Sequence, residues 1–165
     1  MSDYDAEDWG DYEDDVNAGG DDGEDHEISN NFYEAEAMMK SDPKEAVEKF
    51  ETVVMLEEAA NKTEFSYKAI KNLVLLSAHP KVKDYDNMIK KTGDLLRRSG
   101  TESKSDVEQA INEILDSVSN NLASEPKTAT QMYKLILDQL KTSNERLWFN
   151  TSLRLGQIYL GAHDF

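Results

Sequence analysis

The chain has 165 residues, a formal net charge of −16 and no cysteine, and its length suits one domain of ordinary size. The lack of cysteine excludes a disulfide framework, a thiolate metal site and a thiol nucleophile. The N-terminus lacks the segments of a secretory signal and no apolar run could span a bilayer, so we expect a cytoplasmic and nuclear protein without membrane contact.

The acidic charge is concentrated in residues 1–27, which hold 13 acidic side chains and no Lys or Arg, leaving a net charge of −3 on the remainder. Such a segment buries too little apolar surface to offset the entropy of ordering. We therefore predict a disordered acidic tail over 1–27 and a folded region over 28–165. Tyr4, Trp9 and Tyr12 lie among the carboxylates, so the tail fits either a solubilising leader or an anchor for a basic partner.

Apolar residues recur at helical spacing after the tail, and strand patterns do not. The pattern predicts helices over 30–40, 44–60, 64–78, 84–98, 106–121, 126–141 and 145–160. Asp42, Pro43 and Glu45 have the order of a capped helix start, and Ser105 with Glu108 has the spacing of a capping box. Because the connections are short, neighbouring helices are expected to pack antiparallel.

The predicted helices repeat along the chain. The second helices of successive pairs begin near Lys44, Asp84 and Pro126, a step of about 40 residues that lies between the tetratricopeptide and HEAT periods. Ala46 and Phe50 look like the second-helix signature of such a repeat. We therefore expect an all-α, tetratricopeptide-like or HEAT-like, right-handed helical-repeat solenoid of about seven helices.

The seventh predicted helix has no following partner in the sequence. Leu155, Gly156 and Tyr159 match the core of a tetratricopeptide first helix, in which the small residue lets a partner helix approach. Trp148, Leu155, Ile158 and Tyr159 would then form a partly bare face, whereas the end unit of a solenoid needs a polar outer face. We expect the chain to be part of a longer protein, cut inside a repeat.

Sequence motifs of catalysis are missing. There is no glycine-rich phosphate loop, no Gly-x-Ser-x-Gly elbow and no His-Glu-x-x-His helix. His26, His79 and His163 do not have the spacing of metal ligands, and no pair of carboxylates is marked out for acid–base work. We expect no catalytic residue, no cofactor and no metal.

Basic residues gather in the second helical pair and in the turn before it. We select five of them as a candidate partner-binding patch: Lys62, Lys68, Lys71, Arg97 and Arg98. Clustered positive charge attracts an acidic partner, but a solvated helical surface has the same composition. Direct nucleic-acid binding is disfavoured, because the acidic tail would repel phosphates.

Four segments resemble, in the same order, the second-subunit family of the COP-nine (constitutive photomorphogenesis) signalosome. They are 42–50, 65–71, 110–116 and 144–159, and Arg146-Leu-Trp-Phe149 is the most specific part. The acidic, aromatic-containing leader is also similar, whereas 83–103 matches weakly. A paralogous proteasome lid subunit, the sixth regulatory non-ATPase particle, shares the architecture and is the nearest alternative.

The resemblance implies an N-terminal helical-repeat arm without the assembly domain (PCI, winged helix) that follows it in the family. It implies a non-catalytic scaffold in a complex that removes Nedd8 from cullins with a zinc metalloprotease in another subunit. Its partners would be the other signalosome subunits and a cullin–RING ligase, whose acidic surface Lys62, Lys68 and Lys71 would meet, directly or through a bridging polyphosphate. A generic helical-repeat adaptor and an acidic-tail chaperone for a basic protein remain alternatives.

Overall fold

The structure is a computed structural model that describes the backbone of residues 21–141 and 143–162, and the side chains there except those of residues 21, 22, 159, 161 and 162. The described part is helical and contains no strand, which confirms the predicted all-α class. Its α-helices are α1 (Asp21–Met38), α2 (Pro43–Ala60), α3 (Ser66–Ser77), α4 (Tyr85–Arg98), α5 (Lys104–Asn121), α6 (Pro126–Leu140) and α7 (Glu145–Ala162). A short 3-10 helix, η2 (Ser99–Thr101), follows α4.

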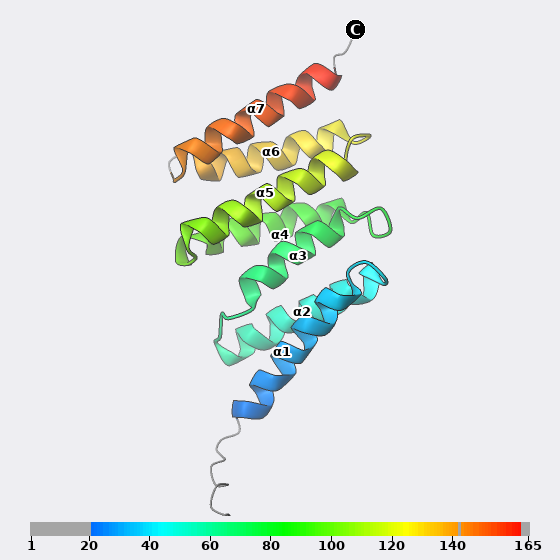
Figure 1. The fold of residues 1–165 in the computed structure, drawn as a ribbon, viewed down its shortest axis with the longest axis vertical. Helices are drawn as coiled ribbons and strands as arrows, with labels where there is room; N and C mark the ends of the chain where they lie inside the picture. The colour runs from blue at the N-terminus through cyan, green and yellow to red at the C-terminus, as the bar shows by residue number, and fades with distance from the viewer. Residues whose placement is uncertain (1–20, 142, 163–165) are drawn as a thin grey trace, which may run out of the picture.

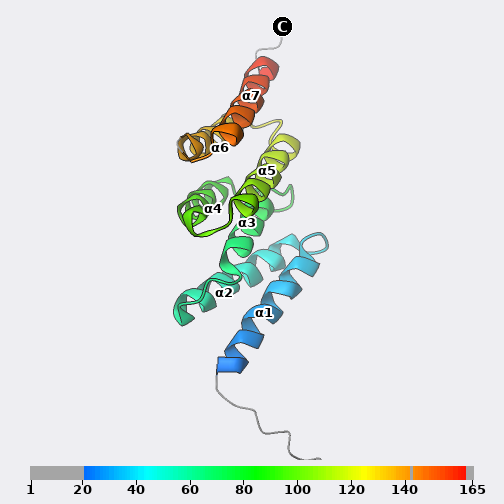
Figure 2. The ribbon, with the colours of Figure 1, turned by 60° about the vertical axis from the view of Figure 1, so that its left-hand side comes forward.

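The helices form two layers that run along the long axis of the molecule. Helices α1, α3, α5 and α7 lie in one layer and α2, α4 and α6 in the other (Figures 1 and 2). Helices α1 to α4 each pack against the next helix of the chain, as do α5 to α7, and the two groups are joined by contacts of α3 with α5 and of α4 with α6. Helices α2, α4 and α6 begin at Pro43, Tyr85 and Pro126, which agrees with the predicted step of about 40 residues. The arrangement is that of a helical-repeat solenoid.

Local hydrogen bonds fix where α2 and α5 begin. The Asp42 carboxylate accepts a hydrogen bond from the Glu45 amide at 3.2 Å, as its position before Pro43 predicts. For α5 the capping residue is Ser103, whose hydroxyl accepts from the Asp106 amide at 3.1 Å. The predicted capping box at Ser105 is therefore wrong. Both serines precede an acidic residue by three positions, so the sequence alone does not distinguish them.

Helix α1 begins at Asp21 rather than at the predicted residue 30, so residues 21–27, assigned to the tail by their composition, are helical here. Residues 1–20 lie outside the described part. Ile28 and Phe32 are each only 2% exposed, and the Phe32 ring lies 5.7 Å from Phe50 and 4.9 Å from Phe65 between centroids. Glu24, an acidic residue of the first helical turn, also interacts favourably with the helix dipole. These contacts stabilise the earlier start.

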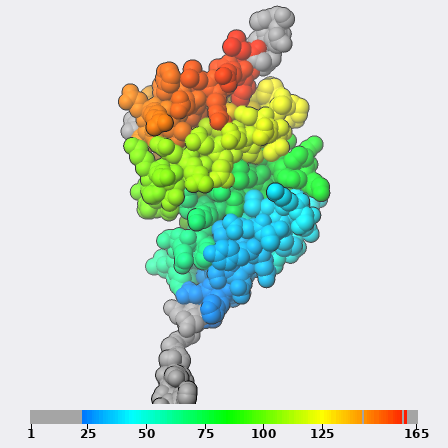
Figure 3. Space-filling view, viewed as in Figure 1, coloured from blue at the N-terminus to red at the C-terminus, as the bar shows by residue number. Residues whose placement is uncertain are grey.

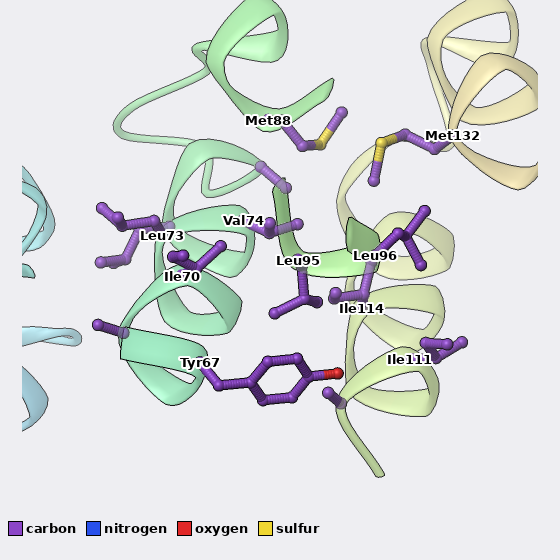
Figure 4. Packing of buried hydrophobic residues seen from close by; sticks show 14 of the residues in the cluster. Tyr67, Ile70, Leu73, Val74, Met88, Leu95, Leu96, Ile111, Ile114 and Met132 are labelled. Atoms are coloured by element: carbon purple, nitrogen blue, oxygen red, sulfur yellow. The ribbon is translucent and has the colours of Figure 1, made fainter. Parts of the chain in front are cut away.

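The core is a continuous apolar seam between the two layers. Figure 4 shows Ile70 and Val74 of α3 on the side that faces Leu95 of α4 and Ile114 of α5, while Leu73 points to the opposite side of α3. Ala46 and Phe50, the residues with a repeat signature, are fully buried in α2. Such close packing of apolar side chains supplies most of the stability of amphipathic helices.

The predicted face of α7 is only partly covered. Trp148, Leu155 and Ile158 are partly buried against the core, which agrees with a partly bare face, while Phe149, Leu153 and Leu160 are more exposed. Leu147 and Thr151 turn toward the core and set the rotation of the helix. Gly156 is exposed, and the side chain of Tyr159, part of the same prediction, lies outside the described residues.

A candidate basic edge for partner binding

The five predicted partner-binding cations come from three neighbouring segments, which together we call the basic edge: Lys62, Lys68, Lys71, Arg97 and Arg98. Lys62 lies in the connection between α2 and α3, Lys68 and Lys71 lie in the first half of α3, and both arginines lie in the last turn of α4. The segments are joined by a hydrogen bond between the Tyr67 and Ser99 hydroxyls, at 3.1 Å between oxygens. The fold therefore brings residues of two helical pairs to one edge.

A buried carboxylate holds the first of these segments. Glu57, in the last turn of α2, is 1% exposed. Its Oε1 accepts from the Ser66 amide at 2.7 Å and from the Ser66 hydroxyl at 2.6 Å, and the Phe65 amide donates to Oε2 at 2.9 Å. Phe65, the residue before α3, provides no side-chain cap. Glu57 thus caps α3 from another helix and fixes the loop that carries Lys62.

Tyr67 forms the inner wall of the edge. Burial raises the pKa of its phenol above the usual value, and the negative charges of Glu102 and Asp106 raise that pKa further, while the hydrogen bond with Ser99 opposes the change. The phenol is therefore neutral at physiological pH. It positions the end of α4 against α3 as a hydrogen-bonding group without charge.

Most cations of the basic edge already have an acidic partner in the same chain. Lys71 pairs with Glu113 of α5 and Arg98 with Glu58 of α2, each at 2.9 Å.

Two further pairs complete this pattern. Lys62 pairs with Asp25 of α1, and Arg97 pairs with Asp94 one turn before it. Lys68 is exposed and, within the described part of the chain, is the member of the edge without an ion pair.

A cleft lies beside the exposed lysine. It has a volume of about 180 Å³ and is lined by Tyr67, Lys68, Lys71, Asp106, Gln109, Ala110 and Glu113. The lining carries both signs of charge, so a ligand that enters must offer anionic groups to the lysines and avoid the two carboxylates. A protein surface with separated acidic side chains meets this condition better than a uniformly charged one.

The ion pairs of the edge belong to a larger pattern that the sequence interpretation missed. Lys91 of α4 pairs with Glu51 of α2 at 2.9 Å, and Arg154 of α7 pairs with Asp116 of α5 at 2.9 Å. The pairs Lys71–Glu113, Lys91–Glu51 and Arg98–Glu58 have sequence separations of 42, 40 and 40 residues. These separations match the repeat, so opposite charges one repeat apart were a usable signal. We call these pairs the inter-repeat ladder.

The described residues do not support a metal site or a membrane-spanning helix. No group of three or more His, Asp or Glu side chains among them could hold a metal ion. None of the described helices is both long enough and apolar enough to cross a membrane. His79 accepts a hydrogen bond from the Lys81 amide at its Nδ1, at 3.0 Å, and so stabilises the turn after α3.

Curated proteins from several eukaryotes are similar to this chain over most of its length. COP9 signalosome complex subunit 2 of Drosophila melanogaster is 32% identical over 98% of the chain and 35% of the relative. The subunit 2 of Caenorhabditis elegans is 35% identical over 98% of the chain and 31% of the relative, and that of Dictyostelium discoideum is 30% identical over 84% and 31%. The chain thus spans about a third of the length of these relatives. No family model and no solved structure matches it.

Proposed function

The chain is a homologue of COP9 signalosome complex subunit 2, and from this relationship we propose that it is a non-catalytic scaffold arm of a signalosome. Its partners would be other signalosome subunits and a cullin–RING ubiquitin ligase, which the arm would position for removal of Nedd8 by a zinc metalloprotease in another subunit. The similarity over nearly the whole chain is the observation that carries the proposal. We further propose that the arm acts in both cytoplasm and nucleus.

The basic edge is the surface proposed to meet the acidic part of the ligase. Lys68 is exposed and can pair with a carboxylate without losing an internal one. Lys62 and Lys71 would exchange Asp25 and Glu113 for carboxylates of the partner, or for a polyphosphate that bridges both proteins. Because these contacts are exposed or half-buried, they would steer association and set specificity, and salt would weaken them.

Charge reversal at the basic edge tests this proposal. The triple variant Lys62→Glu, Lys68→Glu and Lys71→Glu should bind a purified cullin–RING complex at least roughly tenfold more weakly at low salt, a loss of about 1.4 kcal/mol. The single variant Lys68→Glu should show part of this loss, since it breaks no internal ion pair. Binding is measured by surface plasmon resonance, and a thermal melt of each variant shows whether it has folded.

A matched control separates a local effect from a change in total charge. Lys127, Lys134 and Lys141 are exposed on α6 or at its end, and their reversal to Glu changes the net charge by the same amount. This control variant should bind the cullin–RING complex more tightly than the edge variant does. Equal losses in the two triple variants, or unchanged affinity in the folded edge variant, would reject the basic edge as the docking surface.

A further inference from the structure

A groove crosses the layer of α1, α3 and α5 near the C-terminal ends of these three helices. Its volume is about 610 Å³, and the described residues that line it belong to the three helices and to the turns after α1 and α3. Figure 3 looks onto this layer, in which α3 lies between α1 and α5 (Figure 1). Helix α1 packs mainly against α2, whereas α3 packs against α5. The space beside α3 therefore stays open on the side of α1.

The groove lies within the stack of repeats rather than at its last helix. Its described lining comes from residues 36–40, 75–79 and 113–121, and neither α6 nor α7 contributes to it. Its shape is therefore set by three helices that are all in place. Among the described residues it shares only Glu113 with the cleft at the basic edge.

Part of the lining is apolar. Leu75 and Leu76 of α3 line the groove together with Ala37 of α1 and Met39 of the turn that follows α1. Ala37 is exposed, Leu75 and Met39 are partly buried, and Leu76 is buried. A concave apolar surface binds an apolar side chain better than a flat one does, because more water is displaced from both partners.

Three carboxylates of the described residues line the same groove: Glu36, Glu113 and Asp116. Glu36 is exposed and has no ion pair with another described residue. Glu113 and Asp116 pair with Lys71 and Arg154. A carboxylate can accept about four hydrogen bonds, so each of these two can also bind a second cation. The Asp116 side chain is 63% exposed, which leaves it accessible.

The ends of the three helices add negative potential to the groove. Helices α1, α3 and α5 end at Met38, Ser77 and Asn121, and none of them has a basic residue in its last turn. The last carbonyls of a helix lack donors within the helix, and the helix dipole places partial negative charge there. Lys40 and His79 follow the first two ends and line the groove as its basic side chains. The carboxylates and helix ends together outweigh them.

We propose that this groove binds a basic segment of a partner protein in which apolar side chains alternate with arginine or lysine. The cations of the segment pair with Glu36 and Asp116 and lie beside the helix ends. An apolar side chain of the segment packs against Leu75 and Leu76. The same charges repel an acidic segment, so the preference is opposite to that of the basic edge. The groove and its occupant are independent of the signalosome function proposed above.

Fluorescence anisotropy of a short labelled peptide of alternating arginine and leucine tests the groove, at about 150 mM salt to screen weaker charge contacts. The full 165-residue chain should bind it at least roughly fivefold more tightly than a peptide with serine in place of leucine, which keeps the charge and lacks the apolar groups. Replacing arginine by glutamine should weaken binding as much. Equal binding of the serine peptide, or no binding of the leucine peptide, would overturn the proposal.

A pair of matched variants locates the binding on the molecule. The double variant Glu36→Lys with Ala37→Arg adds positive charge and bulk at exposed positions of the groove, and should bind the leucine peptide at least roughly tenfold more weakly. The control Glu48→Lys with Ala59→Arg makes the same substitutions at exposed positions of α2, and should stay within about twofold of the unchanged chain. Thermal melts show that both variants fold. Equal losses would reject the groove as the binding site.

The absence of cysteine allows a dye to be attached at one chosen position. Asn120→Cys carries an environment-sensitive dye on the α5 side of the groove, and its emission should change when the leucine peptide is added. The same dye on Ala59→Cys should not respond. A response at residue 59 alone, or at neither position, would place the peptide elsewhere and contradict the proposal.

Discussion

Glu57 illustrates how one buried carboxylate determines the path of the chain. A buried charge is costly unless it is paired or fully hydrogen-bonded. Here the carboxylate accepts from two backbone amides and one hydroxyl at the start of α3. Because these donors belong to the first turn of a helix, the helix dipole adds to the attraction. The bonds lock the α2–α3 connection and thereby the place of Lys62.

Replacing this carboxylate should destabilise the fold strongly. Glu57→Gln keeps the shape but turns an amide NH₂ toward backbone donors, so we expect a loss of about 2 kcal/mol in the free energy of unfolding. Glu57→Ala leaves all three donors without an acceptor and should lose about 3 kcal/mol or more. Urea denaturation followed by circular dichroism at 222 nm measures both losses.

Glu58→Gln is the control for Glu57. Its side chain is 61% exposed and pairs with Arg98 at the surface, where a single ion pair contributes about 0–1 kcal/mol. The two variants should therefore differ clearly in their urea midpoints. Equal destabilisation would contradict the capping role of Glu57.

The role of Glu57 could not be predicted from the sequence, whereas that of Asp42 could. Asp42 caps its own helix three residues away, so the local pattern contains the whole interaction. Glu57 and Glu58 are adjacent and chemically identical, and the choice between them depends on where α3 packs. The pairing of Lys71 with Glu113 of α5 is a different case, because the two residues lie one repeat apart and their spacing could have indicated the pair.

At the scale of helices, the inter-repeat ladder complements the apolar seam. The seam supplies burial, which is not directional, while the ladder joins corresponding positions of neighbouring repeats. Lys91 has a side chain only 12% exposed, and Glu51 is 40% exposed. A partly buried pair of this kind gains more than a fully exposed one, because water screens it less.

A charge swap tests the ladder. Lys91→Glu and Glu51→Lys should each lower the free energy of unfolding by about 1 kcal/mol, since each places like charges together. The double variant should recover most of that loss. A double-mutant cycle of thermal or urea unfolding measures the coupling energy, and strictly additive losses would show that the two residues do not interact.

The helices themselves were largely predictable. Those from α2 to α7 begin and end within two residues of the sequence expectation, because proline, capping residues and apolar spacing are local signals. Helix α1 begins nine residues early. Its first turns are acidic and look disordered by composition, and they are held by Phe32 and Asp25 through contacts with segments far along the chain. Composition cannot report such contacts.

At the scale of the whole molecule, the basic edge is nearly neutral in the isolated chain. Four of its five cations pair with Asp25, Glu58, Asp94 or Glu113. An anionic partner must therefore compete with carboxylates that are already in place. The five residues of the basic edge carry five positive charges, but in the folded chain the paired carboxylates offset most of that charge.

Neutralising the internal carboxylates should strengthen anion binding at the edge. The double variant Asp25→Asn and Glu113→Gln removes one carboxylate beside Lys62 and one beside Lys71, so we expect its affinity for inorganic tripolyphosphate to rise at least roughly threefold at low salt. Isothermal titration calorimetry measures this. Glu34→Gln and Asp116→Asn remove two carboxylates from the ion pairs of Lys49 and Arg154 instead. An equal gain in that control would show a general charge effect.

The two-layer stack also has a mechanical consequence. Each helix is linked to its immediate or second neighbours along the chain, so a pull applied along the long axis is carried by all the hairpins in series. Stacked repeats of this kind yield stepwise, from whichever end is weaker. Such a rod behaves as a compliant spring, which stretches by releasing single hairpins and shortens as they fold back.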